Sequence, residues 1–259
     1  MNIVSNETFS YSTYISDDFL IWTMTTNGYK YITYNLYESL KKANISWKLM
    51  IICIDRESQK FLQNMNVPCV YYKSLSSVQV STQPSQFGSD TFMIFNKIKL
   101  DLMELIRKEV PESVKYITYL DGDIVVFKDF MPYIKKQFNE SNSILLFQND
   151  DLYDVVNTRA NGCTGFFSFK VQPLEKSPFL IDNLALWKEI REDQVWVNNK
   201  LLEYKLEFDY LKRSLFPNGT YLKEERWKKC DPYMIHYNHI VGNTKITMMK
   251  KNNHWYLIY

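Results

Sequence analysis

Apolar runs alternate with amphipathic segments along the first half of the chain. Unbroken apolar runs predict buried strands, and apolar residues that recur every three or four positions predict helices. The expected strands are 19–25, 48–54, 67–72 and 116–120. The expected helices are 29–43, 56–66 and 92–108. This alternation is typical of a parallel sheet covered by helices, an α/β fold.

The second half of the chain is less regular. It is expected to hold two strands, a largely helical stretch and a tail of turns and short strands, at 144–147, 165–169, 178–199 and 233–259. Residues 74–90 are rich in Ser and Gln and are predicted to form a loop. No repeat or linker divides the chain, so we expect one domain over 19–259, preceded by an N-terminal extension over 1–18.

Composition and charge narrow the classes of function. Of the 259 residues, 46% are hydrophobic and 23% are charged, as in ordinary folded domains. The net charge is +2 and there is no basic stripe, so nucleic acid and anionic membranes are poor partners. No apolar run reaches the roughly 18 residues of a membrane span. The cysteines are scattered and the N-terminal residues carry no apolar run, so we expect a reduced, cytoplasmic protein.

Two carboxylates follow the strand 116–120, in the order Asp121-Gly122-Asp123. Ligands bind at the carboxyl ends of strands in open α/β sheets. In extended backbone, residues i and i+2 project to the same side, so these carboxylates can share one divalent cation. Gly122 lets the backbone approach a ligand closely. An Asp-Gly turn between two apolar runs is also a common hairpin signal, and these residues alone leave both interpretations open.

Two of the three histidines, His236 and His239, lie close together near the C-terminus, followed by Gly242 and Lys245. An imidazole can complete a carboxylate metal site. Gly242 permits a close approach to a phosphate, and Lys245 can neutralise one. The alternative is an ordinary pair of surface or core histidines. The carboxylate pair elsewhere in the chain favours the metal site, with both histidines as candidate ligands.

These motifs, taken in order, resemble those of the nucleotide-diphospho-sugar transferases, metal-dependent glycosyltransferases of the GT-A fold. The similarity extends over 19–257 and is closest to the family that includes the plant rhamnogalacturonan xylosyltransferases, with a more distant similarity to glycogenin-like enzymes. The motifs that carry it are Thr26-Asn27-Gly28-Tyr29, Ile54-Asp55, Leu120-Asp121-Gly122-Asp123, Thr164-Gly165-Phe166-Phe167, Asp193-Gln194 and His236-x-Asn238-x-x-x-Gly242. The resemblance implies a single GT-A-type domain with a Rossmann-like, mostly parallel central sheet flanked by helices.

The resemblance also implies a chemistry. The donor would be a nucleotide sugar, usually a UDP-sugar, and the acceptor a glycan, a protein or a small molecule. Transfer would use Mn²⁺ or Mg²⁺ and retain the anomeric configuration. Asp121 and Asp123 would bind the metal. We favour His239 over His236 as a further ligand, because its spacing to the Gly and Lys that follow fits the better-defined family pattern.

Two adjacent residues take the catalytic roles in this scheme. Gln194 would lie below the anomeric carbon of the donor sugar, and Asp193 would hydrogen-bond the hydroxyl groups of that sugar. The remaining nucleotide-sugar contacts would come from Thr25, Asn27, Tyr29, Asp55, Lys97, Asp121, Gly122, Cys163, Thr164, Gly242 and Lys245. The relatives usually have Asn in place of Cys163, so the donor sugar stays open.

Three other functions compete with this hypothesis. A sugar nucleotidyltransferase would also use paired carboxylates and a metal, but usually adds a Gly-rich phosphate loop, which 25–29 is not. A catalytically inactive nucleotide-sugar-binding module would not need to keep the carboxylates, the histidines and Lys245. A phosphohydrolase of the Asp-x-Asp-x-Thr type is disfavoured because Val125 occupies the Thr position. The pattern does not indicate the acceptor or the oligomeric state.

Overall fold

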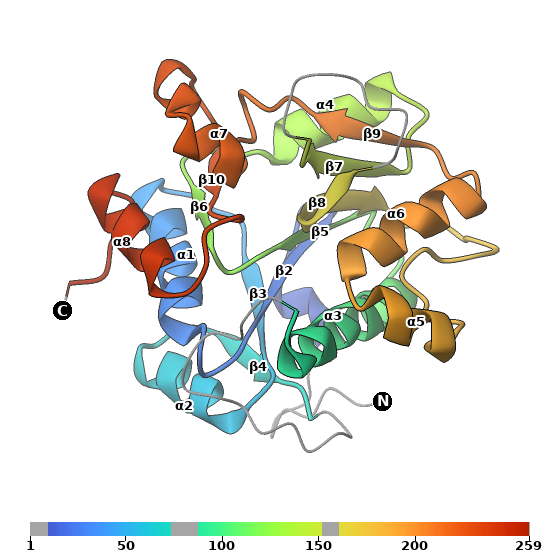
Figure 1. Cartoon of the computed structure of the whole chain (residues 1–259), viewed down its shortest axis with the longest axis horizontal. Helices are drawn as coiled ribbons and strands as arrows, with labels where there is room; N and C mark the ends of the chain where they lie inside the picture. The colour runs from blue at the N-terminus through green and yellow to red at the C-terminus, as the bar shows by residue number, and fades with distance from the viewer. Residues whose placement is uncertain (1–9, 74–87, 152–160, 259) are drawn as a thin grey trace.

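One twisted sheet runs through the centre of the computed structural model, which describes residues 10–73, 88–151 and 161–258 (Figure 1). Its strands are β1 (Ile15–Ser16), β2 (Phe19–Thr25), β3 (Leu49–Cys53), β4 (Cys69–Tyr71), β5 (Tyr116–Leu120), β7 (Leu145–Asn149), β8 (Gly162–Lys170) and β9 (Phe208–Leu211). The strand order is β4-β3-β2-β5-β8-β7-β9, and β1 pairs with β2.

The sheet is mostly parallel. Strands β4, β3, β2 and β5 run in one direction, β7 and β9 are parallel to each other, and β8 is antiparallel to both β5 and β7. The predicted α/β fold with a mostly parallel sheet is therefore confirmed. The antiparallel β8 places the first residues of that strand beside the carboxyl ends of β5 and β7.

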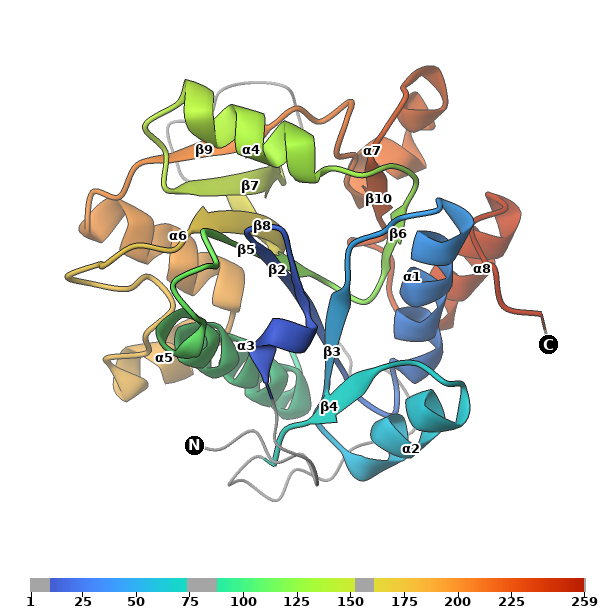
Figure 2. The same ribbon diagram turned by 180° about the vertical axis from the view of Figure 1, so that it is seen from behind.

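Helices cover both faces of the sheet (Figures 1 and 2). They are α1 (Lys30–Lys42), α2 (Arg56–Asn64), α3 (Asp90–Glu109), α4 (Met131–Glu140), α5 (Leu184–Ile190), α6 (Asp193–Glu203), α7 (Gly219–Lys223) and α8 (Asn243–Lys251). Successive side chains of a strand point to opposite faces of the sheet, so β2 contributes side chains to two hydrophobic cores. Leu20 and Trp22 pack with side chains of α3 and α6, whereas Phe19 and Ile21 pack with those of α1, α2 and α4.

A small second sheet lies beside the main one. Strand β6 (Ile124–Val126) pairs antiparallel with β10 (Met234–His236), which places His236 opposite Ile124. Strand β5 pairs with β2 and β8, and not with β6. The hairpin interpretation of Asp121-Gly122-Asp123 is therefore wrong, because this segment crosses from the main sheet to the small one.

The structure corrects the predicted elements at several points. In place of one largely helical stretch over 178–199, the chain forms α5 and then α6, which extends to Glu203. Arg191, with a left-handed backbone (φ 59°), and Glu192 separate the two helices. The tail contains helix α8, which the sequence pattern did not predict. Residues 74–87 of the expected loop lie outside the described residues, and Asp90 already begins α3. Tyr11 and Tyr14, from the segment expected to be an extension, pack into the core.

No helix within 10–73, 88–151 and 161–258 has the length and apolar character needed to cross a membrane.

Candidate active site

A cavity of about 400 Å³ lies at the carboxyl edge of the main sheet. Its lining includes Thr25 at the end of β2, Asp121 after β5 and Asp150 after β7. The first turn of α6, the loop after β10 and the start of α8 close its other sides. This is the edge at which open α/β sheets bind ligands.

Thirteen of the residues expected from the sequence line this cavity: Thr25, Tyr29, Asp121, Gly122, Asp123, Cys163, Thr164, Asp193, Gln194, His236, His239, Gly242 and Lys245. They come from segments far apart in the chain. Convergence on one cavity supports a common function, although the individual role of each residue stays a prediction.

The other three expected residues, Asn27, Asp55 and Lys97, are not part of the cavity lining. The buried Asp55 carboxylate accepts hydrogen bonds from the backbone N–H groups of Asn27 and Ser58, each at 2.7 Å, and so caps α2. Asp55 therefore holds the turn that precedes Tyr29. Lys97 is partly exposed on α3 and forms an ion pair with Asp101 at 2.6 Å.

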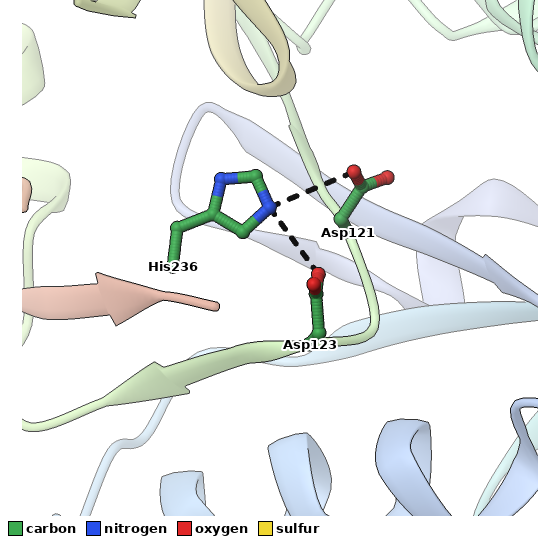
Figure 3. Close-up of side chains that lie close together, drawn as sticks. All are labelled: Asp121, Asp123 and His236. Carbon is green, nitrogen blue, oxygen red and sulfur yellow. Dashed lines mark ion pairs between the residues drawn. The ribbon is translucent and has the colours of Figure 1, made fainter. Parts of the chain in front are cut away.

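Among the residues that the structure describes, Asp121, Asp123 and His236 form a group of side chains that could hold a metal ion (Figure 3). One ligand atom of each lies within 4.8 Å of the others. His236 Nε2 lies 3.2 Å from Oδ1 of Asp123 and 3.7 Å from Oδ2 of Asp121. The hydroxyl of Tyr119 also donates to Oδ1 of Asp121 at 2.8 Å. The sequence did not single out Tyr119.

Gln148 determines which nitrogen of His236 faces the carboxylates. The Gln148 amide nitrogen donates to the carbonyl oxygens of Phe216 and Pro217, both at 3.0 Å, so its oxygen is directed elsewhere. That oxygen lies 2.7 Å from His236 Nδ1, which must carry the proton of this hydrogen bond. The buried Nε2 has no hydrogen-bond partner among the described residues. Because Nδ1 carries its own proton, Nε2 is the nitrogen that can give a lone pair to a divalent cation held by the two carboxylates.

The charges in this group stabilise one another. Burial raises the pKa values of Asp121 and Asp123, but neighbouring positive charges outweigh this effect. Lys99 and His236 lower the pKa of Asp121 below its ordinary value. Lys245 and His236 do the same for Asp123. Burial lowers the pKa of His236, yet Asp123 and Asp121 raise it well above its ordinary value. Both carboxylates are therefore ionised, and without a metal ion the protonated His236 balances part of their charge. A divalent cation would take the place of the proton on Nε2.

His239 belongs to a different part of the cavity. Its Nε2 lies 3.0 Å from Oδ1 of Asp150, and its backbone has a left-handed conformation (φ 58°). The chain turns at this residue, so the three-residue spacing does not bring the two imidazoles to the same carboxylates. The geometry favours His236 over His239 as the third ligand, contrary to the preference drawn from spacing.

Two buried lysines contact the carboxylates of the cavity. Lys245, which the sequence suggested could neutralise a phosphate, forms an ion pair with Asp123. Lys99 forms an ion pair with Asp193 and lies 3.9 Å from Oδ1 of Asp121. Burial lowers the pKa of Lys99, but Asp193 and Asp121 outweigh this effect and raise it. Lys99 was not predicted from the sequence as a site residue. Its place on the apolar stripe of an amphipathic helix could have indicated a buried, functional lysine.

Gly165 provides the room in which His236 and Asp121 meet. A Cβ atom at this position would overlap Cε1 of His236 and lie 2.5 Å from Oδ2 of Asp121. Gly122 has a similar constraint on another side, because its Cβ would lie 2.5 Å from Oγ1 of Thr33. The sequence suggested that Gly122 admits a ligand, whereas its immediate neighbour is a side chain of α1.

The fold is that of the GT-A glycosyltransferases. A solved galactosyltransferase, LgtC, in complex with donor and acceptor sugar analogues, superposes with a TM-score of 0.56 and 9% identity, over 92% of this chain and 97% of that one. Mouse xyloside xylosyltransferase 1 superposes with a TM-score of 0.52 and 10% identity, over 85% and 97% of the two chains. The glycosyltransferase GlyE of Streptococcus pneumoniae superposes with a TM-score of 0.51 and 14% identity, over 92% of this chain and 60% of that one.

The sequence profile of the nucleotide-diphospho-sugar transferases matches residues 45–249. This match spans most of the chain, and the chain belongs to that family. It is therefore a glycosyltransferase of the GT-A type. A comparison with curated protein sequences finds no match.

Proposed function

We propose that this protein transfers a sugar from a UDP-sugar to an acceptor hydroxyl, using Mn²⁺ or Mg²⁺ held by Asp121, Asp123 and His236. The observation that carries the proposal is the position of the buried Nε2 of His236, which has no hydrogen-bond partner among the described residues and lies 3.2 Å and 3.7 Å from two ionised carboxylates. Carboxylate oxygens and a neutral imidazole nitrogen are a donor set that suits Mn²⁺.

The charge of the cavity supports the need for a cation. Among the described residues, its lining includes the carboxylates of Asp121, Asp123, Asp150, Glu192 and Asp193, against two lysines and two histidines. An anionic diphosphate would be repelled by this excess of negative charge. A bound divalent cation would supply Lewis-acid stabilisation of the negative charge that develops on the departing diphosphate.

The side of the cavity formed by α8 suits the nucleotide. Tyr29 offers an aromatic face for the base, and the ammonium of Lys245 lies 5.5 Å from the centre of that ring. Gly242 has a positive φ of 58° and directly precedes α8. A left-handed glycine before a helix lets backbone N–H groups approach a phosphate. Lys245 would then exchange part of its contact with Asp123 for the diphosphate.

The opposite side suits the sugar. Gln194 and Asp193 begin α6 and line the cavity, where Asp193 accepts a hydrogen bond from Oγ1 of Thr164 at 2.8 Å. In the transfer, the acceptor oxygen bonds to the anomeric carbon, the bond from that carbon to the diphosphate oxygen breaks, and the acceptor proton passes to the departing diphosphate. Attack from the leaving-group side retains configuration, while the Gln194 oxygen stabilises positive charge from the other side.

The direct test is a donor screen. The protein is incubated with Mn²⁺ and UDP-glucose, UDP-galactose or UDP-xylose, and the released UDP is measured. We expect slow release without acceptor, loss of that release in EDTA, and a decrease of about 10²–10³ in Asp123→Ala. Full activity in EDTA would contradict the metal assignment. If added pyrophosphate is consumed and UTP and sugar 1-phosphate are formed from the UDP-sugar, the protein is a nucleotidyltransferase. UDP binding without turnover would indicate a binding module. A β-linked product from an α-linked donor would indicate inversion.

A further inference from the structure

The amide of Gln194 has a fixed orientation at the edge of the cavity. Its nitrogen donates to Oδ2 of Asp150 at 3.1 Å and to Oδ1 of Asn161 at 3.2 Å. An amide nitrogen has two hydrogens, and these two acceptors use both. The amide oxygen therefore points away from Asp150 and Asn161 and has no donor among the described residues.

A second carboxylate fixes the amide of Asn161. Asn161 Nδ2 donates to Oδ1 of the buried Asp151 at 2.9 Å, and a carboxylate can only accept. The amide nitrogen of Asn161 must therefore face Asp151, which leaves the Asn161 oxygen facing Gln194. Asp150 acts on Gln194 directly, and Asp151 acts on it through Asn161. Both paths require the same orientation of the Gln194 amide.

Asp150 is itself held firmly. Its Oδ1 accepts hydrogen bonds from Asn218 Nδ2 at 3.1 Å and from Asn238 Nδ2 at 2.9 Å, and lies 3.0 Å from Nε2 of His239. Only its Oδ2 faces Gln194. Burial raises the pKa of Asp150, but His239 and Gln194 lower it below its ordinary value. Asp150 is therefore an ionised acceptor whose two oxygens have separate tasks.

We propose that Asp150 and Asn161 are positioning residues that hold the Gln194 amide with its oxygen toward the anomeric carbon of the donor sugar. The proposal rests on the proposed function, because it assigns Gln194 the role of stabilising the reacting sugar. A flipped amide would direct N–H groups at a carbon that becomes positively charged, which opposes the reaction.

The variant Asp150→Asn tests this orientation with minimal change in volume. The new amide keeps its oxygen toward the three donors of Asn218, Asn238 and His239, so its NH₂ group faces Gln194. Either the Gln194 amide then flips, or its NH₂ group faces the new NH₂ group at position 150 without an acceptor. We expect kcat for UDP release from the best UDP-sugar, with Mn²⁺, to fall by about 10–100-fold. The affinity for UDP with Mn²⁺, measured by calorimetry, should stay within about twofold, because UDP lacks the sugar.

A double-mutant cycle separates orientation from a merely structural effect. The carboxylate of Gln194→Glu has no NH₂ group to orient. In that background, Asp150→Asn should cost no further kcat, and should raise it by removing repulsion between two carboxylates. Equal losses of kcat in both backgrounds would overturn the proposal. The milder Asn161→Ala removes one of the two acceptors and should lower kcat less than Asp150→Asn, so it decides the matter if Asp150→Asn does not fold.

The failures of the two proposals are distinguishable. Normal UDP binding and unchanged kcat in both Asp150→Asn and Asn161→Ala would overturn the positioning role and leave the glycosyltransferase function intact. A wild-type protein that neither binds UDP with Mn²⁺ nor releases it from any UDP-sugar would overturn both.

Discussion

The side-chain oxygen of Gln148 lies 2.7 Å from Nδ1 of His236, and this contact presents the other imidazole nitrogen to Asp121 and Asp123. Gln148 is completely buried, so the contact is shielded from water. Such an outer hydrogen bond fixes both the tautomer and the ring orientation of a metal-binding histidine.

Removing this contact should weaken metal binding. In Gln148→Leu, the imidazole of His236 is free to rotate or to protonate Nε2. We expect Mn²⁺ affinity to fall by about 10–100-fold, the usual effect of losing such a partner. Titration followed by the electron paramagnetic resonance of free Mn²⁺ measures it. Gln137→Leu, on α4, is the control. Equal Mn²⁺ affinity in both variants would show that Gln148 does not orient the ligand.

The two histidines should differ in their effect on metal binding. His236→Ala removes a nitrogen that faces both carboxylates, whereas His239→Ala removes a partner of Asp150. We therefore expect the larger loss of Mn²⁺ affinity in His236→Ala, in the same titration. The reverse ranking would restore His239 as the ligand, in agreement with its spacing in the sequence.

A single methyl group at position 165 should disturb the same site. In Gly165→Ala, the added Cβ overlaps His236 and Asp121, so these side chains must separate. We expect Mn²⁺ affinity and UDP release to drop by about tenfold or more, because ligand geometry has to be held closely. Ser168→Ala lies on the same strand outside the cavity and is the control. Wild-type Mn²⁺ affinity in Gly165→Ala would contradict the assignment.

Lys99 and Lys97 form a natural pair for comparison on one helix. Lys99→Ala leaves Asp193 and Asp121 without their buried cation, whereas Lys97→Ala breaks a partly exposed ion pair with Asp101. We expect Lys99→Ala to lower kcat for UDP release by about tenfold or more. Lys97→Ala should be close to wild type in both kcat and melting temperature. Comparable losses of kcat would support the donor contact that the resemblance assigned to Lys97.

His254 should make stability depend on pH. It is buried against Phe127 and Trp227, and its Nδ1 lies within hydrogen-bond distance of the hydroxyl of Tyr237, at 2.7 Å. Burial lowers its pKa to about 4. Between that value and the unfolded pKa of about 6.5, the unfolded chain binds a proton that the folded chain does not. The free energy of unfolding therefore decreases as pH falls through this range.

The size of this effect can be measured against His254→Phe, which cannot bind the proton. Between pH 7 and pH 5, we expect the wild type to lose about 2 kcal/mol more stability than the variant, in urea unfolding followed by fluorescence. Parallel pH dependence in the two proteins would show that His254 titrates alike in the folded and unfolded states.

The sequence by itself predicted the sheet and the edge at which the cavity lies. Strands such as β2 and β5 are buried on both faces, so each appears in the sequence as a continuous apolar run and can be predicted from that run alone. Asp121 and Asp123 follow such a strand directly, and the carboxyl end of a strand is fixed by chain direction alone. The short-range pattern therefore placed Asp121 and Asp123 at the cavity, and the family resemblance added other lining residues such as Thr164 and Gln194.

Tertiary structure decided which of two nearby side chains faces the site. Residues two apart on a helix point about 200° apart, so Lys99 is buried beside Asp193 while Lys97 is partly exposed. The left-handed backbone at His239 turns that side chain to Asp150 and leaves His236 with the carboxylates. The roles of Gln148 and Asp150 arise only where β7, α6 and the loop after β10 meet. The direction of a side chain depends on long-range contacts, and these contacts cannot be predicted from periodicity along the chain.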